Sequence, residues 1–133
     1  MNSDSNLVNY QGSCHCHVIT FEIKAPEILE VDECNCSICK KTGFLHLILP
    51  KSHFRLLTGN EYLTDYQFNT HTAHHTFCGI CGIKPFYIPR SNPDGIDVNV
   101  RCLDPIPKNI IVTPFDGINW EKNAASLKTK SKE

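Results

Sequence analysis

Short apolar or alternating segments, most of them ended by glycine, proline or asparagine, recur along this chain. Seven of them have the length and the β-branched, aromatic or leucine-rich composition typical of strands. They span residues 18–23, 44–49, 54–57, 62–68, 74–77, 85–88 and 96–100. The last alternates strictly, which places Ile96, Val98 and Val100 on one face. Because no window carries a helical repeat of apolar residues longer than about two turns, the pattern predicts an all-β domain.

The length of 133 residues predicts a single domain. We expect a disordered N-terminal tail at residues 1–6, one folded domain at residues 7–122, and a flexible C-terminal tail at residues 123–133. The last segment is mildly basic, since it carries Lys128, Lys130 and Lys132. Individually short strands bury little apolar surface, so a metal ion would add needed stability to a domain of this kind.

Charge and hydropathy exclude several classes of protein. The formal net charge is −1, which offers few phosphate contacts, so we do not expect a nucleic-acid partner. No apolar run approaches the ~20 residues needed to cross a bilayer, so we expect no membrane association. The polar first six residues lack the basic and apolar stretches of a signal peptide. We therefore expect a cytoplasmic protein, with a nuclear location as the alternative.

Seven of the eight cysteines fall into three tight groups, and their spacing suits a metal better than disulfides. The groups are Cys14 and Cys16; Cys34, Cys36 and Cys39; and Cys78 and Cys81. Partners one residue apart can hardly bridge each other, and a chain without a signal peptide is expected in a reducing compartment. Two pairs and one triplet of thiolates are therefore predicted to bind zinc.

The two pairs together predict a closed structural zinc site. Side chains two residues apart on an extended segment point to the same face, so Cys14 and Cys16 can reach one ion. Cys78 and Cys81 have the spacing of a zinc knuckle, and Gly79 and Gly82 permit its tight turn. Such a site would connect the beginning of the fold to a segment far along the chain.

The triplet Cys34, Cys36 and Cys39 leaves one of four tetrahedral positions without an obvious ligand. Cys102 stands alone at the end of an alternating segment and is expected to be a buried packing residue. Histidines remain open as a fourth ligand, and a closed structural site remains the alternative to an open one. The histidines concerned are His46, His53, His71, His74 and His75. An open position would allow zinc to bind and acidify a water or a thiol.

The cysteine motifs resemble the glutathione-dependent formaldehyde-activating (GFA) family, which includes centromere protein V-like proteins. The motifs are Gly12-Ser13-Cys14-His15-Cys16, Cys34-Asn35-Cys36-Ser37-Ile38-Cys39-Lys40-Lys41-Thr42-Gly43 and Phe77-Cys78-Gly79-Ile80-Cys81-Gly82. Connecting segments at 54–63, 66–69 and 98–104 agree, so the resemblance covers about residues 7–121. It departs from the commonest pattern at Lys40-Lys41, where an arginine often begins the pair, and at Ile83-Lys84-Pro85, where small residues are frequent.

The resemblance implies an Mss4-like fold, a β-tent of small antiparallel sheets joined by zinc, with two zinc ions per chain. It assigns Cys14, Cys16, Cys78 and Cys81 to a structural zinc. It assigns Cys34, Cys36 and Cys39 to a second, catalytic-type zinc.

The function implied by the resemblance is that of a carbon–sulfur lyase or synthase acting on an adduct of glutathione, or another thiol, with formaldehyde or a related small electrophile. The substrate thiol would take the open zinc position. Four cations are candidates for binding the carboxylates of glutathione, and two histidines for a general base. These residues are Lys40, Lys41, Arg55 and Arg101, and His46 and His53. The alternatives are a non-enzymatic zinc module that binds a partner, as centromere protein V-like proteins suggest, and a redox sensor that uses the triplet.

Overall fold

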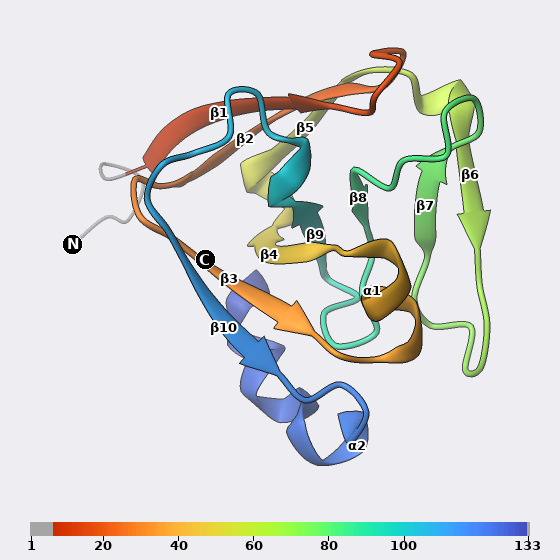
Figure 1. Cartoon of the computed structure of the whole chain (residues 1–133), viewed down its shortest axis with the longest axis vertical. Helices are drawn as coiled ribbons and strands as arrows, with labels where there is room; N and C mark the ends of the chain where they lie inside the picture. Colours follow the sequence, from red (N-terminus) through yellow and green to blue (C-terminus); the bar gives the residue numbers. More distant parts are fainter. Residues whose placement is uncertain (1–6, 133) are drawn as a thin grey trace.

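The computed structural model describes residues 7–132, which form three small sheets and a few short helical turns (Figure 1). The strands are β1 (Leu7–Ser13), β2 (Thr20–Pro26), β3 (Leu29–Cys34), β4 (Leu45–Pro50), β5 (Phe54–Thr58), β6 (Leu63–Tyr66), β7 (His75–Cys78), β8 (Phe86–Tyr87), β9 (Gly95–Asn99) and β10 (Ile110–Phe115). The helices are α1 (Ser37–Thr42) and α2 (Trp120–Asn123). The 3-10 turns are η2 (Lys51–His53), η3 (Asn60–Tyr62), η4 (Val100–Cys102) and η5 (Ala124–Ser131). The predicted all-β fold class is confirmed.

The strand orders are β1-β2-β5, β10-β3-β4-β9-β8 and β6-β7. In Figure 1 the first sheet lies along the top, the five-stranded sheet in the middle, and the β6–β7 pair at the right. Each of the seven predicted segments overlaps a strand, whereas β1, β3 and β10 have no counterpart in the prediction. β1 and β3 contain several residues that are depleted in strands, such as asparagine, glycine, aspartate and glutamate, and β10 carries a proline, so their strand signals are weak.

Two neighbouring inner strands of the large sheet, β4 and β9, are buried on both faces. All six residues of β4 and all five of β9 are buried. The predicted apolar face of β9 packs in the core through Ile96 and Val98. The opposite face is also covered and carries polar side chains, since Asp97 is only 1% exposed. β9 pairs with β4 in the register His46↔Asn99 and Ile48↔Asp97.

The C-terminal segment departs from the flexible tail expected at 123–133. Residues 120–131 form α2 and η5, and Ala124, Leu127 and Ser131 are buried. The segment packs on β4, and Figure 1 shows its turns behind β3. Asn92 is 1% exposed and donates from Nδ2 to the carbonyls of Leu127 and Lys128, at 2.9 and 3.2 Å. The tail expected at 1–6 lies outside the described residues.

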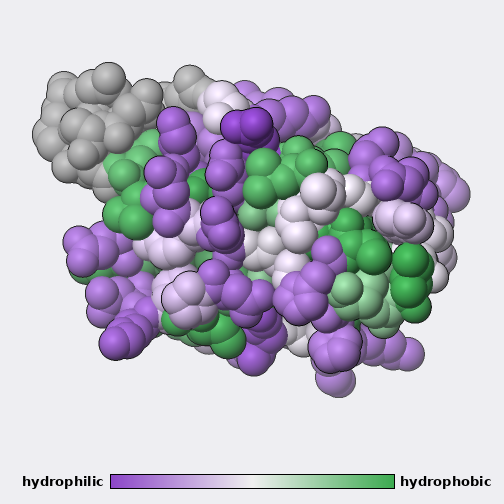
Figure 2. All heavy atoms as spheres, turned by 90° about the horizontal axis from the view of Figure 1, so that it is seen from above, coloured by the Kyte–Doolittle hydropathy of each residue, from purple (hydrophilic) through white to green (hydrophobic). Residues whose placement is uncertain are grey.

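The surface is mixed in character. Figure 2 shows the molecule from above, with hydrophobic patches separated by hydrophilic side chains. Within residues 7–132 no helix is both long and apolar enough to cross a membrane.

Candidate metal centres and adjoining cavity

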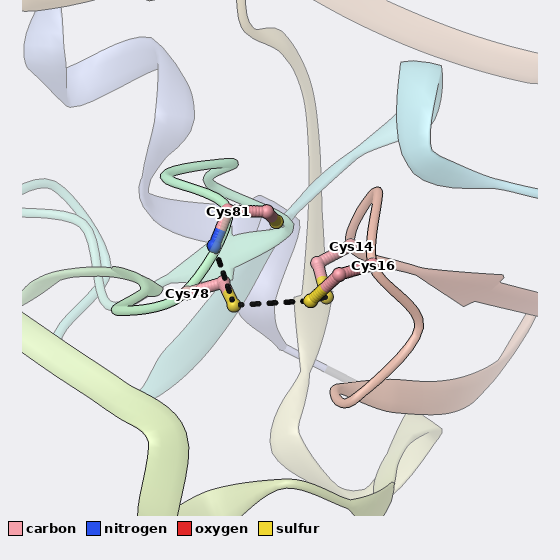
Figure 3. Close-up of side chains that lie close together, drawn as sticks. All are labelled: Cys14, Cys16, Cys78 and Cys81. Carbon is pink, nitrogen blue, oxygen red and sulfur yellow. Dashed lines mark hydrogen bonds between the residues drawn. The ribbon is translucent and has the colours of Figure 1, made fainter.

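The sulfurs of Cys14, Cys16, Cys78 and Cys81 converge from two distant parts of the chain (Figure 3). The first two follow β1, while Cys78 ends β7 and Cys81 lies in the turn after it. All four sulfurs lie within 4.8 Å of one another. The Sγ–Sγ distances from Cys16 to Cys14 and to Cys78 are both 3.7 Å. Four thiolates placed tetrahedrally at the usual zinc–sulfur distance would be about 3.8 Å apart, so the cluster fits a zinc ion.

The backbone of the knuckle is arranged to stabilise negatively charged sulfur. The N–H groups of Ile80 and Cys81 each donate to Cys78 Sγ at 3.4 Å. Burial raises the pKa of the Cys81 thiol, but hydrogen bonds from the backbone of Ile83 and Cys16 outweigh it, and the pKa falls to about 6. Gly82 adopts φ +81° in this turn, a conformation that glycine adopts without strain.

The triplet is gathered by the junction of β3 and α1. Cys34 ends β3, Cys36 is the N-cap of α1, and Cys39 is buried within that helix. Residues three apart on a helix share a face, which brings Cys36 and Cys39 together. Gly43 ends the helix at φ 68°, where its N–H donates to the carbonyl of Cys39. The three sulfurs lie within 4.8 Å of one another.

The three thiols of the triplet are not equivalent. Hydrogen bonds from Cys34 and Cys39 hold the pKa of Cys36 far below its ordinary value. Hydrogen bonds with Cys34 and Cys36, together with burial, raise the pKa of Cys39. Because a metal requires deprotonated ligands, metal binding at the triplet would release the protons that these thiols hold.

A buried histidine and carboxylate support the triplet from the sheet. His46 Nε2 lies 3.1 Å from Cys39 Sγ, and His46 Nδ1 lies 2.6 Å from Asp97 Oδ2. The Tyr87 hydroxyl approaches Nδ1 at 3.4 Å. His46 is not part of the group of atoms that lie within 4.8 Å of one another. It therefore contacts one of the three cysteines and resembles the partners that orient metal ligands in other proteins.

One carboxylate oxygen in this region is buried without a partner. Asp97 Oδ1 makes no hydrogen bond within residues 7–132, although Asp97 is 1% exposed. A buried polar atom without a partner is costly, and such atoms in native proteins mark sites of strain, function or ligand binding. Asp97 is also among the residues that line the cavity described below.

A buried cation lies beside these groups. Lys84 is 7% exposed, and its Nζ donates to His75 Nδ1 at 2.7 Å and lies 3.8 Å from the centre of the Tyr87 ring. Burial lowers the pKa of Lys84 to about 8, although Cys39 and Asp97 act in the opposite direction. Burial and the charge of Lys84 lower the pKa of His75 to about 4. At neutral pH the pair is therefore a lysine cation bonded to a neutral imidazole.

A cavity of about 720 Å³ lies against the triplet. Its floor includes Cys34, Cys36, Cys39, His46 and Asp97, and none of the four cysteines of the other cluster lines it. Cavities of this size commonly hold small-molecule ligands. The two clusters therefore differ in their surroundings: the triplet faces the cavity, whereas the four-cysteine cluster lies away from it.

Several residues singled out from the sequence lie elsewhere. Among the described residues that line the cavity, Lys40, Lys41, Arg55 and Arg101 are absent, whereas Arg90 and Lys122 are present. Arg55 pairs with Glu22, and Arg101 donates to the carbonyl of Gly43.

Of the histidines considered as ligands, His46 and His75 line the cavity, and His53, His71 and His74 do not. Cys102 is buried and belongs to neither cluster. Burial raises the pKa of its thiol to about 12.

The sequence analysis missed Asp97 and Lys84 as functional candidates. Asp97 occupies a polar position of an alternating segment, and such a position usually faces solvent. Its burial depends on the pairing of β9 with β4 and β8, which has no local signal in the sequence. Lys84 did leave a signal in the sequence. It lies just after the knuckle of Cys78 and Cys81, where the sequence analysis noted a departure from the small residues that are frequent in the GFA family.

Two separate cysteine clusters, carried by small sheets and their turns, define the class of protein. It is a cysteine-rich protein with two sites able to hold metal ions. Comparison with known proteins then identifies the family. The family of the glutathione-dependent formaldehyde-activating enzyme matches residues 9–114, and the chain belongs to this GFA family.

The name of one relative agrees with this assignment, and one solved structure shares the fold. A Halomonas elongata protein, provisionally named a glutathione-dependent formaldehyde-activating enzyme, is 29% identical over 79 residues, which is 53% of this chain. The match spans about half the length of that relative (50%). The crystal structure of a Rhodobacter sphaeroides protein superimposes with a TM-score of 0.69 at 34% identity, covering 77% of this chain and 99% of the other.

Proposed function

We propose that the protein is a zinc-dependent carbon–sulfur lyase or synthase acting on adducts of glutathione, or another thiol, with formaldehyde or a related small electrophile. Cys34, Cys36 and Cys39 would be the ligands of the catalytic zinc. The other four clustered cysteines would hold a structural zinc. The observation that carries the proposal is that the three-cysteine cluster faces the cavity while the four-cysteine cluster does not.

The donor set of the triplet suits this role. Three thiolates within 4.8 Å of one another can hold one zinc ion and leave its fourth position free. When bound there, zinc would supply Lewis acidity and lower the pKa of a substrate thiol. The family name supports the choice of a glutathione adduct as substrate.

Cleavage of a hydroxyalkyl thioether requires a base for one proton. As the carbon–sulfur bond breaks, its electron pair stays on sulfur, the hydroxyl proton leaves, and the carbon–oxygen bond becomes the carbonyl of the aldehyde. The sulfur takes up a proton when the thiol is released, and synthesis is the reverse. Asp97 lines the cavity, and its Oδ1 is buried without a hydrogen-bond partner among residues 7–132, so we take this oxygen as the candidate acceptor of the hydroxyl proton.

The surrounding residues fix this carboxylate and balance its charge. His46 bonds to Asp97 Oδ2, so the carboxylate is held with Oδ1 available. Lys84 contributes a positive charge near Asp97, Cys36 and Cys39. In a buried site this charge offsets the negative thiolates and carboxylate more strongly than it would in water.

The test combines a binding readout with turnover. Cobalt would replace zinc in the full chain, so that the absorption spectrum reports thiolate ligands, and glutathione would be added. Exchange between glutathione, formaldehyde and S-hydroxymethylglutathione would be followed by NMR with the zinc-loaded protein. We expect glutathione to change the cobalt spectrum and the protein to accelerate exchange. Absence of both effects in a fully metal-loaded sample would overturn the proposal.

Two variants separate binding from chemistry. Cys36→Ser should abolish both the spectral change and turnover, because it removes a ligand of the reacting site. Asp97→Asn should keep the spectral change but slow exchange by about 100-fold or more, the range typical of a lost general base. Undiminished exchange by Asp97→Asn would remove this residue from the mechanism.

A further inference from the structure

One wall of the cavity comes from a part of the chain beyond the residues that the family match covers. The match ends at residue 114. Eight of the residues that line the cavity lie between 115 and 127. The candidate metal-binding floor therefore lies within the family match, whereas this wall lies beyond the residue at which the match ends.

The wall is rich in large apolar side chains. Phe115, Ile118, Trp120 and Leu127 line it, and Phe68 faces the same cavity from the segment between β6 and β7. Ile118 is 72% exposed and Phe68 is 37% exposed. Large apolar groups exposed together at a cavity mark a binding surface, because a ligand that covers them removes that area from water.

The wall is held in place by ion pairs, hydrogen bonds and one cation–π contact. The guanidinium of Arg90 stacks on the Trp120 ring at 3.8 Å and pairs with Glu121. Asn92 holds the segment by its backbone, as described above, and Lys130 pairs with Asp32 at 2.6 Å. A wall held in this way needs little ordering when a ligand binds.

We propose that this wall selects thiol adducts that carry a large apolar or aromatic group. The group would lie between Trp120, Ile118 and Phe68 while the sulfur occupies the triplet site. This inference rests on the proposed function, since it takes the triplet as the place of the sulfur. The adduct of a small polar thiol would leave the apolar wall uncovered, whereas a thiol that carries a ring or a branched chain would cover it.

Trp120 provides a direct measurement, because it is the only tryptophan in the sequence and it lines the cavity. The zinc-loaded full chain would be titrated with 2-mercaptoethanol and with phenylmethanethiol, and tryptophan fluorescence would report binding. The two thiols offer the same zinc-binding atom and differ in the apolar group. We expect phenylmethanethiol to bind about 10- to 100-fold more tightly, as burial of a phenyl ring predicts.

A matched pair of variants tests whether the wall causes this preference. Ile118→Ser replaces an exposed isoleucine of the wall and should reduce the preference at least about 5-fold. Ile106→Ser replaces an isoleucine that is 59% exposed and does not line the cavity, so the preference should remain.

The outcomes distinguish the two proposals. Equal affinity for both thiols, or an unchanged preference in Ile118→Ser, would overturn the role of the wall and leave the thiol site intact. Failure of both thiols to bind the zinc-loaded protein would overturn the proposed function and this inference with it.

Discussion

Gly117 makes room for the triplet although it lies about 80 positions away along the chain. A Cβ atom at this position would lie 2.2 Å from Cys34 Sγ and 3.0 Å from Cys36 Cβ. Neither neighbour can yield without moving a sulfur or the backbone of α1. Glycine is therefore required here for close approach to the cysteines.

We predict that Gly117→Ala weakens metal binding at the triplet by at least about 10-fold, the effect typical of disturbing the surroundings of a metal site. Native mass spectrometry should show loss of one metal, and alkylation should reach Cys34, Cys36 and Cys39. The four cysteines of the other cluster should stay protected. Gly43→Asn is the control, because a side chain there meets nothing within 4 Å and asparagine tolerates the left-handed conformation. Equal metal content in the Gly117→Ala variant and the unmodified protein would contradict the prediction.

Local spacing explains which site residues could be predicted. Cys34, Cys36 and Cys39 lie within six positions, so their convergence follows from strand and helix geometry alone. Gly117 and Asp97 act on the same site from distant segments. Their positions depend on strand pairing and on the return of the chain, which one sequence does not specify.

The C-terminal element illustrates the same limit at the scale of a segment. Its lysines resemble a solvated tail, yet Lys130 and Lys132 pair with Asp32 and Asp94. These carboxylates lie far away in the sequence, and Asn92, which holds the backbone of the segment, resembles a turn residue. The packing of this element is therefore a tertiary property.

We predict that Asn92→Ala lowers the free energy of unfolding by about 2–3 kcal/mol, because it leaves buried polar groups of the segment without a donor. Denaturant titration would measure the loss, and limited proteolysis should become faster between residues 115 and 132. Metal content at the four-cysteine cluster should not change.

Ser126→Ala is the control for this variant. Ser126 is exposed in the same element and donates to the carbonyl of Asn123, so its loss should cost less than about 0.5 kcal/mol. Similar losses in both variants would contradict a specific role for Asn92.

At the scale of the molecule, the four-cysteine cluster joins two sheets. It connects the loop after β1 to the turn after β7, and Cys16 and Cys78 are 62 positions apart. Cys14 and Cys78 are also part of the hydrophobic core. A metal bound here would hold the β1-β2-β5 sheet to the β6–β7 pair, whereas the triplet closes only a local turn.

We predict that Cys78→Ser lowers the free energy of unfolding by at least about 4 kcal/mol, as expected when a structural metal is lost. Cys36→Ser should cost considerably less, because the triplet joins no distant elements. Thermal and denaturant unfolding, measured together with zinc content, would check both values.

Cys102→Ser accounts for the effect of placing a hydroxyl in the core. Cys102 belongs to the same hydrophobic core as Cys78, but it is part of neither cysteine cluster that could hold a metal ion. If Cys78→Ser costs no more than Cys102→Ser, the cluster does not stabilise the fold through a metal.

The return of β10 to lie parallel with β3 also has a consequence for the order of folding. The contact between Asn35 and Asp116, just beyond this pair, joins positions 81 residues apart. Pairings of such long range form slowly, because the loop between them must close first. The short turn that carries the triplet can form much sooner. The cysteines of the candidate reacting site are thus expected to assemble early in folding, and the wall that encloses them to arrive among the last parts.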